Sequence, residues 1–171
     1  MNHQDFSVVL LDDHGQRIGS KLRRDIDKVH DVVHCVDVLV FDGDKLLINS
    51  IPGTAGQIYV NGLAPAPATM LRVDETTEEA AHRALKKELG IDGGELHLLG
   101  EHFYVYPDGI KRLKTVYWMQ HSGAFTANPE DVANVRWMSR EDVTTAMSTE
   151  PNSIAPVFTG VWDEYQSVLP F

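Results

Sequence analysis

The segment from Glu75 to Leu89 carries residues whose types and spacing could perform chemistry. It reads ETTEEAAHRALKKEL and places acidic and basic side chains along one predicted helix. A carboxylate such as Glu88 is a ligand that hard divalent cations prefer, whereas Arg83 and Lys87 can contact phosphate oxygens directly. The segment therefore indicates either a metal-assisted site or a phosphate-binding site.

The same charges would also suit an exposed helix without any chemical role. Glu75, Glu79, Arg83 and Lys87 are spaced by four residues. Pairs of opposite charge at this spacing stabilise a helix by about 0.2–0.5 kcal/mol each. The charge ladder alone therefore does not separate a functional helix from a solvated one.

The ends of this helix are well defined in the sequence. Asp74, Thr76 or Thr77 can cap its first turn, and Gly90 stands where a glycine commonly ends a helix. An apolar stripe at four-residue spacing predicts the face that packs on the core: Ala81, Leu85 and Leu89.

The elements that must position this helix are mostly strands. β-branched and apolar runs, separated by turn residues, predict strands at 7–11, 17–19, 34–41, 45–49, 58–60, 96–105, 113–121 and 135–138. Further helices are predicted from Arg140 to Met147 and in the last segment, where Phe158, Val161, Trp162, Tyr165, Val168 and Leu169 recur at helical spacing. Strands interleaved with about three helices predict an α/β layered domain.

Composition narrows the classes of partner. The chain of 171 residues has a formal net charge of -10, which argues against nucleic acid and against an anionic membrane surface. A local cationic pocket for a small phosphorylated molecule is still compatible with an acidic body. The start of the sequence lacks the pattern of a signal peptide, so a cytoplasmic location is the expectation.

The segment from Pro67 to Ile91 resembles the Nudix box. The box pattern is a Gly, five residues, a Glu, seven residues and then Arg-Glu-aliphatic-any-Glu-Glu-any-Gly-aliphatic. The matching residues in register are Glu75, Arg83, Leu85, Glu88, Gly90 and Ile91. The resemblance implies a Nudix fold over residues 1–171, with a mixed β-sheet sandwiched between α-helices.

The box is degenerate in this chain. Ala84 stands where the pattern has the Glu after Arg, Lys87 replaces the first Glu of the pair, and Thr69 replaces the Gly. Of the three helix carboxylates that usually ligate metal or activate water, Glu88 alone is retained. The resemblance implies Mg²⁺ or Mn²⁺ as cofactor, but most of the expected ligands are missing.

Roles for individual residues follow from the resemblance. Glu88 would be catalytic and Arg83 its orienting partner, while Glu88, Glu75 and Asp131, with Glu130 as an alternative, would hold metal. If metal is not used, Arg83, Lys86 or Lys87 would meet phosphate directly. Tyr104 or Tyr106 could stack on a base of the substrate or could simply pack in the fold.

The hairpin VDVLVFDGDKLLINS is typical of the family, and residues 1–30 are expected to form an N-terminal strand extension. The opening LLDDHGQRIGSKLRRDIDKVHDVVH looks like the N-terminal extension of the branch that includes isopentenyl-diphosphate isomerases and their hydrolase relatives. His30 and His34 could be metal ligands by that resemblance. Isomerase activity is not expected, because the loop NGLAPAPATML lacks the cysteine that those enzymes need. Cys35 lies in a predicted core strand and is interpreted as a small buried residue.

Two functions remain open at this point. The first is hydrolysis of a nucleoside diphosphate linked to another group, with weak or atypical metal dependence. The second is a catalytically silent domain that binds a phosphorylated ligand or a protein partner. The resemblance is also compatible with a homodimer.

Overall fold

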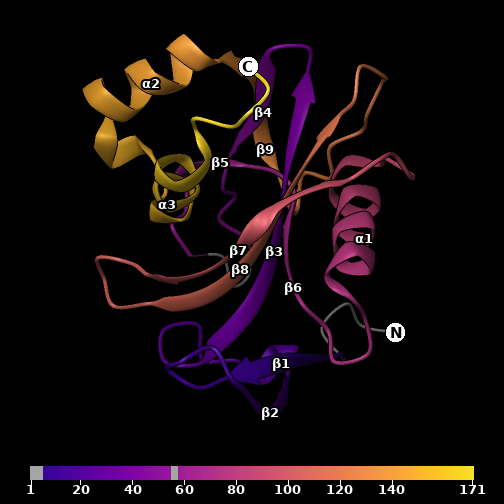
Figure 1. Cartoon of the computed structure of the whole chain (residues 1–171), viewed down its shortest axis with the longest axis vertical. Helices are drawn as coiled ribbons and strands as arrows, with labels where there is room; N and C mark the ends of the chain where they lie inside the picture. The colour runs from indigo at the N-terminus through magenta and orange to yellow at the C-terminus, as the bar shows by residue number, and fades with distance from the viewer. Residues whose placement is uncertain (1–5, 55–57) are drawn as a thin grey trace.

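The computed structural model describes residues 6–54 and 58–171, and within them nine strands form one mixed sheet between helices. Helix α1 covers one face of the sheet, and α2 and α3 cover the other (Figure 1). The strands are β1 Ser7–Leu11, β2 Arg17–Leu22, β3 Val32–Asp42, β4 Lys45–Ser50, β5 Leu63–Pro65, β6 Ala68–Met70, β7 His97–Val105, β8 Lys111–Gln120 and β9 Ala133–Ser139. The helices are α1 Thr77–Leu89, α2 Arg140–Thr149 and α3 Pro156–Tyr165, with short 3-10 turns at Arg23–Asp25 and Pro151–Ser153. The predicted α/β architecture is confirmed.

Strand β3 is the centre of the sheet. It pairs antiparallel with β1, β4 and β6, and parallel with β8 from Val33 to Phe41. Because successive side chains of a strand point to opposite faces, β3 serves two cores. Val36, Val38 and Val40 pack beneath α1, whereas Leu39 and Phe41 pack beneath α3.

Helix α1 begins and ends as the sequence indicates. The Thr76 side chain accepts a hydrogen bond from the Glu79 N–H, and the Glu79 carboxylate accepts one from the Thr76 N–H, which completes a capping box. Gly90 closes the helix with φ at 66°, a backbone conformation that glycine adopts without strain. Ala81, Leu85 and Leu89 are fully buried, as predicted.

Two expectations about elements were wrong. Residues 58–60 form a bend and turn instead of a strand, and the short strands β5 and β6 occupy the loop that follows. Helix α3 ends at Tyr165, so Val168 is exposed although Leu169 is buried. Among the described residues, no helix has the length and apolarity needed to cross a bilayer.

Candidate functional site

A pocket of about 530 Å³ lies between the N-terminal segment, β3, β6, β8 and the end of α1. A cavity of this size suits a small organic ligand. Its lining includes seven of the chain's 15 lysine and arginine residues: Arg23, Lys28, Arg72, Arg83, Lys87, Arg112 and Lys114. Four acidic residues also line it, namely Asp37, Glu88, Glu130 and Asp131. A chain with net charge -10 therefore concentrates its positive charge in one cavity.

Glu88 faces this pocket from the last turn of α1. It follows Leu85 by three residues, so it lies on the buried stripe of the helix and is only 7% exposed. Its Oε2 accepts a hydrogen bond from the Ala68 N–H at 3.3 Å. Burial, helped by the nearby Asp131 carboxylate, raises the pKa of Glu88 to about 8. Glu88 therefore holds a proton over much of the neutral pH range.

Glu75 and Arg83 form a bidentate ion pair at the other end of the box. Arg83 donates from Nε and NH2 to the two Glu75 oxygens, at 2.9 and 2.5 Å. Glu75 also accepts the Arg72 N–H at 2.8 Å. Arg83 further donates to Thr69 Oγ1 and to the Met70 carbonyl, and thus ties α1 to β6. These contacts favour a positioning role for both residues, and the assignment of Glu75 as a metal ligand stays a prediction.

Asp131 reaches the pocket because its loop closes the C-terminal end of α1. The Asn128 N–H donates to the Glu88 carbonyl, and the Asn128 side chain donates to Asp131 Oδ2 at 2.7 Å. The other oxygen, Asp131 Oδ1, accepts from Lys87 Nζ at 2.7 Å. Lys87 is therefore directed along the protein surface to a carboxylate next to Glu88 instead of outward into solvent.

A second lysine–carboxylate pair lies deeper in the pocket. Lys114 on β8 pairs with Asp37 on β3, and the two side chains are 4% and 11% exposed. Asp37 stands opposite Ala68 in the β3–β6 register, and Ala68 is also the residue that binds Glu88. The carboxyls of Asp37 and Glu88 consequently meet at the same end of the cavity.

Three of the cations that line the pocket are Arg23, Lys28 and Arg72. Within residues 6–54 and 58–171, no carboxylate forms an ion pair with Arg23, Lys28 or Arg72. Arg72 lies over the ring of Phe6, with its guanidinium 4.1 Å from the ring centroid. Desolvation, with Arg23 as a nearby like charge, lowers the pKa of Lys28. Such a group of cations is complementary to an anion.

Arg112 holds the N-terminal segment against the sheet. It is 3% exposed, and its guanidinium donates to the carbonyls of Lys28, Asp31 and Lys111. The segment from Lys21 to Lys28 therefore contributes Arg23 and Lys28 to the pocket.

Other candidate residues lie elsewhere. Tyr104 is absent from the described lining of the pocket and stacks on Tyr106, next to Gly160 of α3. Its role in binding substrate stays a prediction that the geometry does not favour. Cys35 packs against the small core cluster of Val8, Ile26 and Val33 and also lines the pocket, and burial raises the pKa of its thiol. Lys86 pairs with Asp92 at 2.8 Å and does not line the pocket.

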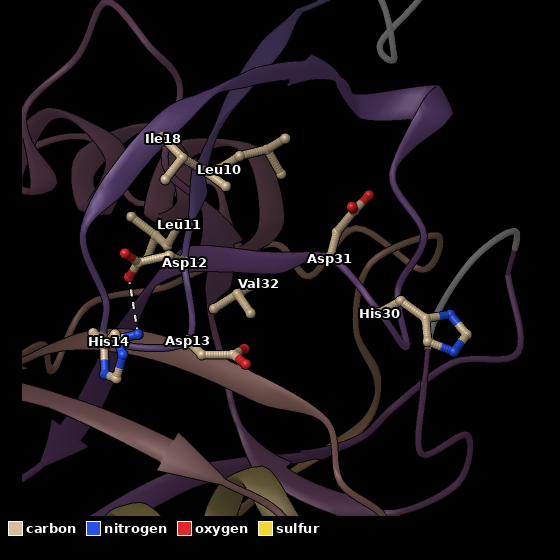
Figure 2. A pocket seen from close by; sticks show the side chains of 9 residues that line it. All are labelled: Leu10, Leu11, Asp12, Asp13, His14, Ile18, His30, Asp31 and Val32. Carbon is tan, nitrogen blue, oxygen red and sulfur yellow. Dashed lines mark hydrogen bonds between the residues drawn. The ribbon is translucent and has the colours of Figure 1, made fainter.

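The histidines near β3 do not converge on a metal position. His34 is buried and contacts Thr115 Oγ1 at 2.8 Å, on the sheet face opposite Asp37. His30 contacts Asp27 Oδ2 at 2.8 Å. Figure 2 shows the His30 ring turned away from the carboxylates of Asp12 and Asp13, which line a second, open hollow beside β1.

Our sequence reasoning missed most of the cations of the site. Arg112 and Lys114 alternate with apolar residues in KRLKTVYW, so both side chains fall on one face of β8. This pattern in β8, which lies next to the buried strand β3, could have indicated a polar cavity at that face of the sheet. Arg23, Lys28 and Arg72 carried no comparable pattern, since only tertiary packing brings them together.

Comparison with known proteins places this arrangement in a family. The model of the NUDIX domain matches residues 30–158 of the chain. This chain belongs to the Nudix family. It is 28% identical over 159 residues to an isopentenyl-diphosphate Delta-isomerase of Paenarthrobacter aurescens, a match that covers 87% of this chain and 84% of that protein. It is 30% identical over 100 residues to the phosphatase NudJ of Escherichia coli, covering 56% of this chain and 65% of NudJ.

The fold is shared with solved structures of low sequence identity. The crystal structure of DR0079 from Deinococcus radiodurans superposes with a TM-score of 0.76 at 18% identity, over 93% of this chain and 99% of that one. The predicted Nudix fold and the relation to isopentenyl-diphosphate isomerases are thus confirmed.

Nudix hydrolases generally use divalent metals such as Mg²⁺, but the residues of this site do not fit such an ion. Ala84 offers no oxygen and is 1% exposed, and Lys87 brings an ammonium group to Asp131. In the part of the chain that the structure describes, no three His, Cys, Asp or Glu side chains are grouped to hold a metal.

Proposed function

We propose that this Nudix protein hydrolyses a nucleoside diphosphate linked to another group, with weak or atypical dependence on metal. The observation that carries the proposal is the gathering of seven cations and Glu88 in one pocket of an otherwise acidic protein. A diphosphate carries several negative charges, so such a pocket provides charge complementarity that the rest of the surface lacks. Similarity to a phosphatase supports the same class of substrate.

The chemistry available to the pocket is displacement at phosphorus by water. Ionised Glu88 would accept a proton from the attacking water as its oxygen bonds to phosphorus and the bridging P–O bond breaks. Lys87 and the cations Arg23, Lys28 and Arg72 would stabilise the charge that develops on the departing phosphate. Because Glu88 must be ionised to act as a base, the rate should rise with pH up to about pH 8.

The experiment that tests this proposal is a survey of turnover. Nucleoside di- and triphosphates, sugar nucleotides and dinucleotides are incubated with the protein in Mg²⁺, in Mn²⁺ and in EDTA, and products are separated by chromatography. The proposal expects cleavage of at least one diphosphate compound, and loss of that cleavage in Glu88→Gln. Absence of turnover on every compound, with the circular dichroism of a folded protein, would rule out the hydrolase.

A second candidate is a silent domain that binds a phosphorylated ligand. It is favoured by the contact between Lys87 and Asp131, which neutralises a carboxylate that a metal-assisted hydrolase would keep free. The same survey separates the two candidates, since a silent domain binds diphosphate compounds without cleaving any of them.

A further inference from the structure

We infer that Lys87 and Lys114 act as fixed replacements for a divalent ion, so that the pocket binds a diphosphate without metal. The inference rests on the proposed function, because it concerns how the same pocket meets its phosphorylated ligand. The degenerate box shows only that metal ligands are missing. The inference adds that two lysines supply the positive charge that the metal ion would have carried. One of them, Lys114, lies outside the box.

The distribution of charge in the pocket carries the argument. Asp37, Glu88 and Asp131 all line the cavity. Asp131 is paired with Lys87 and Asp37 with Lys114, so each of these two carboxylates already has a cation. Glu88 accepts a hydrogen bond from the Ala68 N–H, and in the described part of the chain no lysine forms an ion pair with it.

A divalent ion at this position would meet two ammonium groups. It could gain Asp131 as a ligand only if Lys87 Nζ left Asp131 Oδ1, now 2.7 Å away. At Asp37 it would find Oδ2 already paired with the Lys114 ammonium and could take only the other oxygen, Oδ1, beside that positive charge. Both ammonium groups carry the same sign of charge as the ion and would repel it at this range, so the lysines compete with the ion instead of assisting it.

The two lysines differ in what they can do for a ligand. Lys114 is buried, so its ammonium serves mainly to neutralise Asp37 and to keep the floor of the pocket from being acidic. The side chain of Lys87 is 43% exposed at the edge of the cavity. An ammonium has three N–H donors, so Lys87 can hold Asp131 and still donate to a phosphate oxygen.

Calorimetric titration with inorganic pyrophosphate tests the inference on the full chain. We expect pyrophosphate to bind in EDTA, with an affinity that addition of Mg²⁺ changes by less than about threefold. Lys87→Gln should weaken this binding by about tenfold, as expected for loss of one partly desolvated charge contact. Lys86→Gln is the matched control, because it removes the same charge one residue away and outside the pocket.

A second variant tests the metal directly. Lys87→Glu would place a third carboxylate beside Glu88 and Asp131 and remove the competing ammonium. We expect it to bind Mn²⁺, measured as loss of the free-ion signal in electron paramagnetic resonance, at concentrations where the unaltered protein does not. This readout does not depend on catalytic activity.

The possible failures are distinguishable. Binding of pyrophosphate only in Mg²⁺, or Mn²⁺ binding by the unaltered protein equal to that of Lys87→Glu, overturns this inference and leaves the proposed function standing. If Lys86→Gln and Lys87→Gln weaken pyrophosphate binding equally, the inference is also overturned, because the effect would then come from the net charge of the protein and not from a contact in the pocket. Failure of pyrophosphate to bind in either buffer contradicts the proposed function and this inference together.

Discussion

Arg83 and Glu75, eight residues apart, are joined by two hydrogen bonds that close the loop before α1 onto the helix itself. The two side chains are 21% and 11% exposed, so the pair is largely shielded from water. Arg83 extends the same link to Thr69 and Met70 of β6. The strongest ion pair of the box thus maintains the shape of the site, whereas Glu88 is the carboxyl that faces the cavity.

Replacing Glu75 by Gln should therefore destabilise the fold. The substitution removes the negative charge that pairs with the largely buried Arg83 guanidinium. It should lower the free energy of unfolding by about 3 kcal/mol. Urea denaturation followed by circular dichroism measures this change. Glu78→Gln is the control, because Glu78 lies on the exposed side of the same first turn and should change stability by less than about 1 kcal/mol. Equal effects of the two substitutions would contradict the positioning role.

Glu88→Gln should stabilise the protein, and increasingly so as the pH rises. The folded-state pKa of about 8 lies above the ordinary 4.5, so between these values folding retains a proton that the unfolded chain has lost. Stability of the unaltered protein therefore falls as pH rises through this window, and the loss is complete above about pH 8. Gln keeps an acceptor for the Ala68 N–H but does not ionise.

The expected gain is about 2 kcal/mol at pH 6 and about 4 kcal/mol at pH 8, as an order of magnitude. Thermal unfolding at a series of pH values measures the difference between the two proteins. A difference that does not change with pH would show that Glu88 has an ordinary pKa.

Removal of Lys114 should be more damaging than removal of both members of its pair. Lys114→Met leaves Asp37 buried without its cation and should cost about 3–5 kcal/mol. The double substitution Asp37→Leu with Lys114→Met removes the uncompensated charge and should recover most of that loss. Chemical denaturation of the two single variants and the double variant gives the coupling free energy. Additive effects would mean that the two side chains do not interact.

The capping box of α1 should contribute measurably to the free energy of unfolding and to the stability of the first helical turn. Thr76→Ala removes the acceptor for the Glu79 N–H and should lower the free energy of unfolding by about 1 kcal/mol. Thr76→Ser keeps the hydroxyl and should restore the stability to within a few tenths of a kcal/mol. Because α1 also carries Glu88 and Lys87, the Ala variant should show faster hydrogen exchange at the first turn of that helix. No difference between the Ala and Ser variants would contradict the capping role.

Much of α1 was determined by the sequence itself, because its information is local. The threonine cap, the closing glycine and the four-residue spacing of Ala81, Leu85 and Leu89 are short-range properties of the chain. The same spacing places Glu88 on the inner face. The central strand β3 was equally readable, since a long apolar run with β-branched residues suits a doubly covered strand.

Only the tertiary structure decided what surrounds Glu88. The sequence did not show where the Lys87 side chain lies, and the loop that brings Asp131 to the end of α1 pairs the two residues. Arg23 and Lys28 reach the pocket because Arg112, more than 80 residues later, binds the backbone of their segment. The pairing of Asp37 with Lys114 depends on the parallel register of β3 and β8. Contacts between residues so distant in the chain depend on how strands and loops pack in space, and local patterns of charge and hydrophobicity carry little information about that packing.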